Sequence, residues 1–86
     1  MSFRVPDHVL EENIGNDVVL LSLQSETFYS LNEAGIQLWA TIKGGGDAPV
    51  LEQLLIDTYG IGATQARADV EAFLGELLRL MLIEES

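Results

Sequence analysis

Hydrophobic and polar positions change their spacing along the chain, and each change predicts a structural element. Residues 18–23 are mostly apolar, begin with two β-branched valines and are bounded by polar turn residues, which favours a strand. Residues 27–31, Thr-Phe-Tyr-Ser-Leu, form a second short run after the polar residues 24–26. So short a connection predicts an antiparallel pair, because a parallel crossover needs a dozen or more residues.

Side chains alternate between the two faces of a strand, so the second run can be divided into two sets. Thr27, Tyr29 and Leu31 share one face, whereas Phe28 and Ser30 share the other. We expect Tyr29 and Leu31 to fill the core. Phe28 is then expected to be exposed or to contact a ligand.

Upstream of this pair, the pattern is weaker. Residues 3–5 fit one short strand, and apolar residues at Val9, Leu10 and Ile14 precede a turn signal at residues 15–17. We expect a three-stranded antiparallel sheet from these N-terminal segments.

Helical spacing begins after residue 31 and predicts three helices. Asn32 is a good N-cap for the first helix, and the glycines at 44–46 end it. Asp47 and Pro49 open a second helix that closes at Tyr59-Gly60. Thr64 is the expected cap of a third helix of about 18 residues, judged from its apolar spacing. Its predicted apolar stripe consists of Ala66, Val70, Phe73, Leu74, Leu77, Leu78 and Met81.

Strands followed by helices indicate an α+β fold, with the helices on one side of a small antiparallel sheet. A three-stranded sheet with three helices is also the outline of a winged helix-turn-helix. At 86 residues the chain is expected to form a single domain spanning residues 1–86. For the C-terminal residues 82–86, the sequence allows two outcomes: packing on this domain or fraying.

The charge balance argues against two kinds of partner. The chain has fourteen acidic and four basic residues, which gives a net charge of −10. Nucleic acid and anionic lipid surfaces would be repelled by such a surface, and the third helix carries acidic residues among its arginines. No apolar run approaches the roughly 20 residues of a membrane-spanning helix. With no cysteine and no secretion signal, we expect a cytoplasmic protein.

Residues with catalytic chemistry are sparse. His8 is the only histidine, so metal motifs with two histidines are excluded, and we expect it in a partly exposed loop. No serine lies in a Gly-x-Ser-x-Gly elbow, and the glycines at 44–46 lack the Gly-Lys-Ser/Thr ending of a phosphate loop. The acidic pair Glu11-Glu12 is expected to be solvated. We therefore predict no enzyme activity, no cofactor and no metal.

Binding is the remaining class of function. If the strand at residues 27–31 lies at the sheet edge, its outer N–H and C=O groups are free to accept an extended peptide as an added strand. The third helix, whose apolar stripe is wider than one partner requires, would form the other wall of that groove.

Two segments carry a resemblance to a known family. "VLLSLQSETFYSLNEAGIQLW" resembles the strand, turn, strand and helix signature of PqqD-like proteins, and "LEQLLIDTYGIGATQARADVEAFLGELLRLMLI" is similar to the rest of that family's pattern. The similarity covers residues 18–83. The sequence departs from the pattern at Thr27-Phe28, where a glycine or arginine followed by tyrosine is usual.

The resemblance implies a winged-helix-like recognition element for the leader peptides of ribosomally synthesised, modified peptides. It is most similar to the stand-alone proteins of lasso peptide biosynthesis, which imply two partners: a precursor leader peptide and a separate leader peptidase. The implied peptide-binding residues are Glu26, Thr27, Phe28, Tyr29, Ser30, Leu31, Arg67, Val70, Phe73, Leu74 and Leu77. Three alternatives stay open: a peptide chaperone for a radical SAM enzyme of the PQQ pathway, a winged-helix nucleic-acid binder, and a scaffold subunit without a peptide groove.

Overall fold

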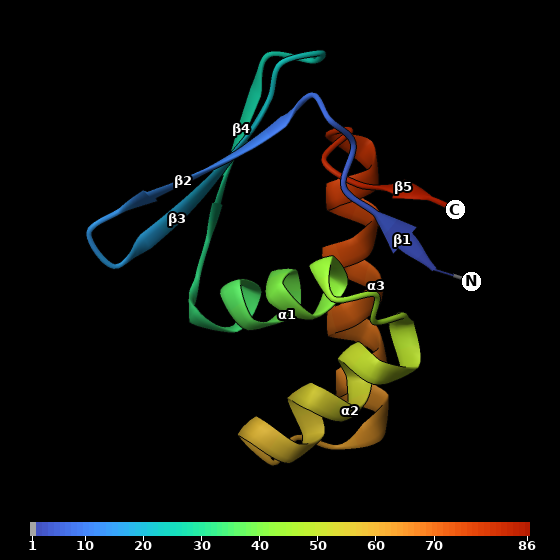
Figure 1. Cartoon of the computed structure of the whole chain (residues 1–86). Coiled ribbons are helices and arrows are strands. Elements are labelled where there is room, and N and C mark those ends of the chain that lie inside the picture. Colours follow the sequence, from blue (N-terminus) through green and yellow to red (C-terminus); the bar gives the residue numbers. More distant parts are fainter. Residues whose placement is uncertain (1) are drawn as a thin grey trace.

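Three longer strands form one sheet beside three helices, and two short strands near the termini pair separately, in the computed structural model, which describes residues 2–86 (Figure 1). The strands are β1 (Phe3–Arg4), β2 (Val9–Ile14), β3 (Asp17–Ser22), β4 (Thr27–Leu31) and β5 (Glu84–Glu85). The helices are α1 (Glu33–Lys43), α2 (Ala48–Tyr59) and α3 (Ala63–Arg79). The predicted α+β fold, a three-stranded antiparallel sheet followed by three helices, is confirmed.

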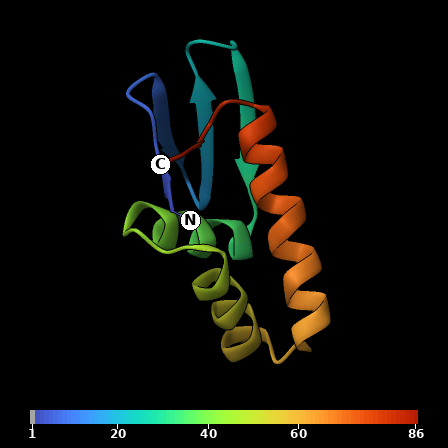
Figure 2. The same cartoon turned by 90° about the vertical axis from the view of Figure 1, so that its right-hand side faces the viewer.

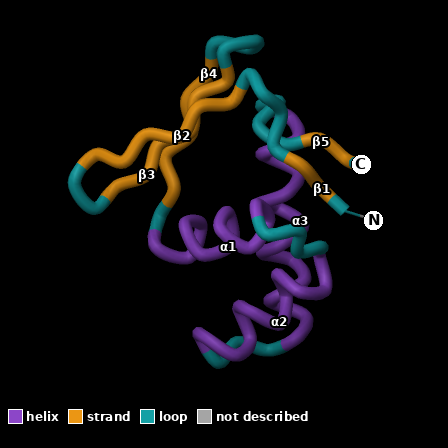
Figure 3. The backbone as a smooth tube through the Cα atoms, viewed as in Figure 1, coloured by secondary structure: helices purple, strands orange, loops and turns teal. Residues whose placement is uncertain are grey.

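The main sheet has the strand order β2-β3-β4, and both pairings are antiparallel. Ile14 pairs with Asp17, so only Gly15 and Asn16 form the β2–β3 turn. Gly15 has a φ of 64°, which glycine adopts without the steric penalty that a Cβ would bring. The resulting hairpin projects away from the helices (Figure 3).

The inner face of the sheet packs on the helices to form one hydrophobic cluster. Val18 and Leu20 of β3 are buried in it, as is Leu31 of β4, and the burial of Leu31 agrees with the core position predicted for it. The remaining members of the cluster are Phe3, Leu38, Trp39, Ile42, Leu51, Leu55, Ala66, Val70, Leu74, Leu77, Leu82 and Ile83. The width of the α3 stripe is explained by this packing, because the sheet, the other helices and the C-terminal segment all meet the helix.

The C-terminal residues are packed rather than frayed. β5 pairs with β1, the side chains of Arg4 and Glu84 form an ion pair, and Leu82 and Ile83 are buried. His8 lies in the turn before β2, half-buried as expected, with Nε2 3.0 Å from the Met81 carbonyl oxygen.

The prediction that Met81 continues the apolar stripe of α3 is wrong. The helix ends at Arg79, and Met81 adopts a left-handed φ of 61° with 40% of its surface exposed. Its N–H donates to the Leu78 carbonyl, and the Leu82 N–H donates to the Leu77 carbonyl. This pair of bonds is a Schellman motif, which satisfies the free carbonyls at the helix end and turns the chain back into the core.

The predicted cap of the first helix is confirmed, and Asp47, which was predicted to open the second helix, is its N-cap. The Asn32 side chain accepts from the Gly35 N–H at 2.7 Å, and the Asp47 side chain accepts from the Val50 N–H at 3.3 Å. The prediction of Thr64 as a cap is wrong, because α3 begins at residue 63 with Gly62 as its N-cap and no side-chain bond. The backbone bond from Ala66 N–H to the Gly62 carbonyl already closes the first turn ahead of Thr64.

Side-chain hydrogen bonds connect β2 to α1. The buried Trp39 indole N–H donates to Glu11 Oε1 at 2.7 Å, and the Lys43 ammonium donates to the same oxygen at 2.8 Å. The hydrogen bonds from Lys43 and then Trp39 lower the pKa of Glu11. Glu11 is exposed, in line with the expected solvated acidic pair, and its carboxylate also accepts from the indole N–H of Trp39 across the sheet–helix junction.

Candidate functional site

The main sheet has two outer strands, β2 and β4, and they differ in charge. Each pairs with β3 alone among the strands that the structure describes. β2 carries Glu11 and Glu12 at its centre, and charges of this kind oppose pairing with a further strand. β4 carries no charged residue. The β4 edge is therefore the one whose chemistry permits an added strand.

The hydrogen-bond alternation identifies the backbone groups at the open edge of β4. The Leu23 N–H donates to the His8 carbonyl at 2.8 Å, which makes His8 and Leu23 a hydrogen-bonded pair between β2 and β3. Because such pairs alternate along antiparallel strands, Leu20 turns its backbone groups toward β4 and pairs with Tyr29. The N–H and C=O groups of Phe28 and Ser30 consequently point away from the sheet.

Helix α3 runs beside this edge. Figure 2 shows β4 as the strand of the main sheet next to α3. The half-buried rings of Tyr29 and Phe73 meet edge to face, with centroids 6.4 Å apart and planes at 64°. This aromatic contact holds the strand and the helix at a fixed separation.

A pocket of about 260 Å³ opens along the inner side of β4, where the strand meets all three helices. Its lining consists of Tyr29, Ser30, Leu31, Asn32, Ala34, Gly35, Leu38, Leu55, Asp69 and Phe73. Most of these groups are apolar, and the exposed Asp69 adds a carboxylate. The pocket can take a side chain with an apolar body and a polar group, because Ser30, Asn32 and Asp69 lie among the apolar residues.

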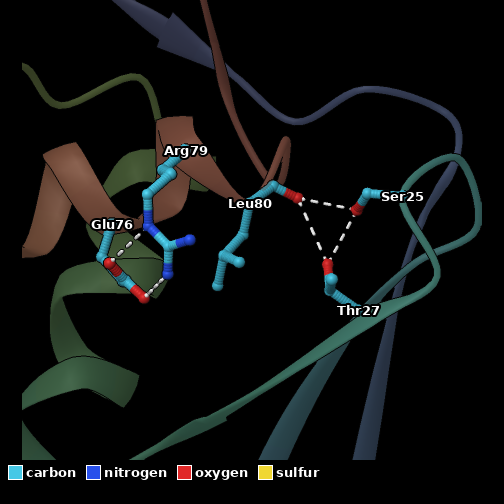
Figure 4. Close-up of polar contacts among 5 residues, drawn as sticks. All are labelled: Ser25, Thr27, Glu76, Arg79 and Leu80. Atoms are coloured by element: carbon cyan, nitrogen blue, oxygen red, sulfur yellow. Dashed lines mark hydrogen bonds and ion pairs between the residues drawn. The ribbon is translucent and has the colours of Figure 1, made fainter.

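The opposite end of β4 is tied to the end of α3. The hydroxyl groups of Ser25 and Thr27 lie 2.7 Å apart, and both reach the Leu80 carbonyl oxygen, at 3.0 and 3.5 Å respectively (Figure 4). We call this set of three residues the hydroxyl clasp. It brings the β3–β4 turn onto α3 and closes the space between strand and helix at this end.

An ion pair lies next to the clasp in Figure 4. The Arg79 guanidinium donates to both carboxylate oxygens of Glu76, and these hydrogen bonds lower the pKa of Glu76 and raise the pKa of Arg79. Both groups stay charged near neutral pH, with the cation in the last turn of the helix, where the helix dipole favours it.

The structure brings together one part of the residue set suggested by the resemblance. Tyr29, Ser30, Leu31 and Phe73 line the pocket. Phe28 is 72% exposed on the outer face of the sheet, as alternation predicts for a residue that does not enter the core.

The other residues of the set lie elsewhere. Glu26 is exposed in the turn before β4 with a φ of 56°, and Arg67 is exposed 4.0 Å from a Glu52 oxygen of α2. Val70, Leu74 and Leu77 are core residues, so their side chains support α3 from behind.

Asp69 and the start of α1 were not singled out from the sequence. The spacing of Asp69 four residues before Phe73 places both on one side of α3, and this is the signal that would have found it. Asn32, Ala34 and Gly35 enter the pocket only because β4 turns directly into α1.

Two further observations concern the described residues. None of the helices within residues 2–86 is both long and apolar enough to cross a membrane. The same residues contain no cluster of three acidic or histidine side chains that could hold a metal ion.

Fold and edge together define a small α+β domain with an open strand edge beside a helix. Residues 17–83, more than half of the chain, match the family Coenzyme PQQ synthesis protein D (PqqD). The chain therefore belongs to the PqqD family.

Two solved structures are similar to this chain. "TbiB1 in Complex with the TbiA(beta) Leader Peptide" shares 25% sequence identity at a TM-score of 0.86, with 96% of each chain covered. "Lasso peptide synthetase B1 complexed with the leader peptide" shares 20% identity at a TM-score of 0.87, with 99% of this chain and 100% of the other covered. A comparison with curated protein sequences gave no match.

Proposed function

We propose that this chain, acting as one recognition domain over residues 1–86, is a non-catalytic adaptor for a ribosomally synthesised precursor peptide. It binds the leader segment as an added strand on the open edge of β4, beside α3. The observation that carries the proposal is the uncharged edge at Phe28 and Ser30 next to the pocket between Tyr29 and Phe73. The similar structures support it, because each is a complex with a leader peptide.

Backbone pairing and side-chain burial contribute differently to such binding. The outward groups of Phe28 and Ser30 offer about four hydrogen bonds, each worth about 1 kcal/mol net. Ordering a flexible leader costs about 2–5 kcal/mol, which cancels most of this gain. A buried apolar anchor adds about 1.5–3 kcal/mol. Strand pairing thus sets the register, while the side chain in the pocket determines which leader binds tightly.

The adaptor presents the bound leader to a separate enzyme, a leader peptidase of lasso peptide biosynthesis. Similarity to lasso peptide synthetase B1 over nearly the whole chain supports this route. The family match to PqqD supports a second candidate, a peptide chaperone for a radical SAM enzyme of the PQQ pathway. A cognate leader that is cleaved in the presence of the adaptor and peptidase, and stays intact without the adaptor, would favour the first.

Proline substitution tests the added strand. Ser30→Pro removes an outward N–H and leaves the bonds between β3 and β4 in place, so leader affinity should fall by at least about tenfold, or 1.4 kcal/mol. Ser30→Ala keeps the N–H and should bind as the wild type does. Asn13→Pro is the matched control, because Asn13 directs its N–H outward from the other edge strand, β2. Leader affinity is measured by fluorescence anisotropy with a labelled cognate leader, and folding by circular dichroism.

Two results would count against the proposal. Wild-type affinity in a folded Ser30→Pro variant means that the peptide does not pair with β4. Equal losses in Ser30→Pro and Asn13→Pro mean that the effect is on folding rather than on the edge. Failure of the wild-type protein to bind its cognate leader even at high micromolar concentration removes the proposed function altogether.

A further inference from the structure

The outer face of the main sheet carries a row of apolar side chains. Leu10 pairs with Leu21, and Leu21 pairs with Phe28, so the three side chains lie next to one another across β2, β3 and β4. Ile14 lies on the same face of β2, four residues after Leu10. Leu10 is 41% exposed, Ile14 63% and Phe28 72%. We call these four residues the outer row.

Isolated exposed apolar residues are common on protein surfaces, but Leu10, Leu21 and Phe28 of the outer row are neighbours across the whole sheet, and Ile14 lies beyond Glu12 on the same face. The core lies on the opposite face, where Leu20 is fully buried. In Figure 1 the β2–β3 hairpin extends away from all three helices, which leaves its outer face toward solvent. Burial of the row therefore requires a second molecule.

The outer row ends at the edge that is proposed to bind the leader. Phe28 contributes to both, because its backbone groups point outward from β4 while its side chain points to the outer face. A peptide strand added to β4 would extend this face by one strand, and every second leader side chain would join the row. A protein that covers the row would thus touch the adaptor and its leader together.

Acidic residues beside the row determine what kind of surface can cover it. Glu12 lies between Leu10 and Ile14 on the same face, and Asp17 is directly opposite Ile14. A second copy of this chain, with its own net charge of −10, would bring like charges together at the contact. A protein surface with an apolar centre and a lysine- or arginine-rich rim matches both features.

We propose that the outer row is the docking surface for the enzyme that processes the bound leader, and that this enzyme offers an apolar patch with a basic rim. The inference rests on the proposed function and extends it, because it assigns the enzyme to the outer face and the leader to the edge of β4. Contacts with alternate leader side chains would make enzyme binding tighter when the leader is present.

The test uses substitutions on β2, away from the leader edge. The variant Leu10→Thr/Ile14→Thr keeps strand propensity but removes apolar surface, and Val50→Thr on α2 is the control with a comparable exposure of 48%. Binding of the purified leader peptidase is measured by interferometry on the adaptor saturated with leader. We expect a loss of at least about tenfold for the double variant, little change for Val50→Thr, and weaker wild-type binding as salt increases.

Leader affinity, measured separately by anisotropy, should be the same in both variants and the wild type. Peptidase affinity unchanged in the double variant would overturn the docking assignment while leaving leader binding intact. A wild-type dimer that the double variant dissociates, seen by light scattering, would assign the row to a second copy and also overturn the proposal. Absence of leader binding by the wild type is a failure of the proposed function and is recognised before any peptidase is added.

Discussion

Replacing Glu11 with alanine tests how much the partly buried hydrogen bond to Trp39 stabilises the fold, compared with an ordinary surface charge. Glu11 Oε1 accepts from the indole N–H of Trp39 at 2.7 Å and from the ammonium of Lys43 at 2.8 Å. Trp39 is only 2% exposed, and the contact joins β2 to α1. Glu11→Ala leaves the indole N–H of Trp39 without its acceptor.

The two lost contacts differ in energy. An unsatisfied buried donor costs about 1–3 kcal/mol, whereas a partly exposed ion pair contributes about 0–1 kcal/mol. We therefore expect Glu11→Ala to lower the free energy of unfolding by about 1.5–3 kcal/mol, most of it from Trp39. Lys43→Met, which removes only the ion pair, should cost at most about 1 kcal/mol.

Glu12→Ala is the matched control. Glu12 is the next residue on β2, is exposed on the outer face and has no side-chain partner within the described residues, so its loss should change stability by less than about 0.5 kcal/mol. Urea unfolding can be followed by the fluorescence of Trp39, the only tryptophan in the chain, together with circular dichroism. Equal stability of Glu11→Ala and Glu12→Ala would refute the reasoning.

The pH dependence gives a second measurement of the same contact. The hydrogen bonds from Lys43 and Trp39 lower the pKa of Glu11 in the folded state below its unfolded value of about 4.3. A group with a lowered folded pKa stabilises the fold above its unfolded pKa and loses this contribution as the pH falls through the folded pKa. The difference between the wild type and Glu11→Ala should thus be largest near neutral pH and shrink in acid.

Two further predictions concern the turn and a helix end. Ser25→Ala/Thr27→Val removes the hydroxyl clasp on the Leu80 carbonyl, and should cost about 1–2 kcal/mol in urea unfolding and weaken leader binding in anisotropy titrations. A variant that is destabilised but binds leader normally would show that the clasp does not position β4. Gly60→Ala should destabilise by about 1 kcal/mol, because Gly60 has a φ of 65°. Gly62→Ala, with extended backbone and open space around it, is its control and should be near neutral in thermal unfolding.

Features that depend on neighbours in the sequence were predictable. The N-cap bond of Asn32 to Gly35 arises within one helical turn, and the exposure of Phe28 follows from strand alternation. Some local predictions nevertheless failed, among them the prediction of Thr64 as the cap of α3. Gly62 adopts the extended cap conformation, so α3 begins before Thr64, the residue with the better capping side chain.

Features that depend on several elements meeting in space were not predictable. The pocket takes Asp69 from α3 and Leu55 from α2, and no short sequence pattern links these positions. The apolar stripe of α3 indicated burial but not its direction. Val70 and Leu77 are fully buried in the core, while Phe73 alone of this stripe lines the pocket.

The open edge of β4 also has to avoid pairing with the same edge of another copy. Uncharged edge strands are prone to such association, and β4 has no charge of its own to prevent it. Here the protection is steric: α3 lies alongside, held to β4 by the contact of Tyr29 with Phe73 and by the hydroxyl clasp. The β4 edge of a second copy carries its own α3, and that helix would clash with α3 of the first copy. A single extended peptide carries no helix and avoids this clash. If the leader binds as proposed, α3 would thereby favour an extended peptide over a folded sheet edge, and a leader is unfolded before it binds.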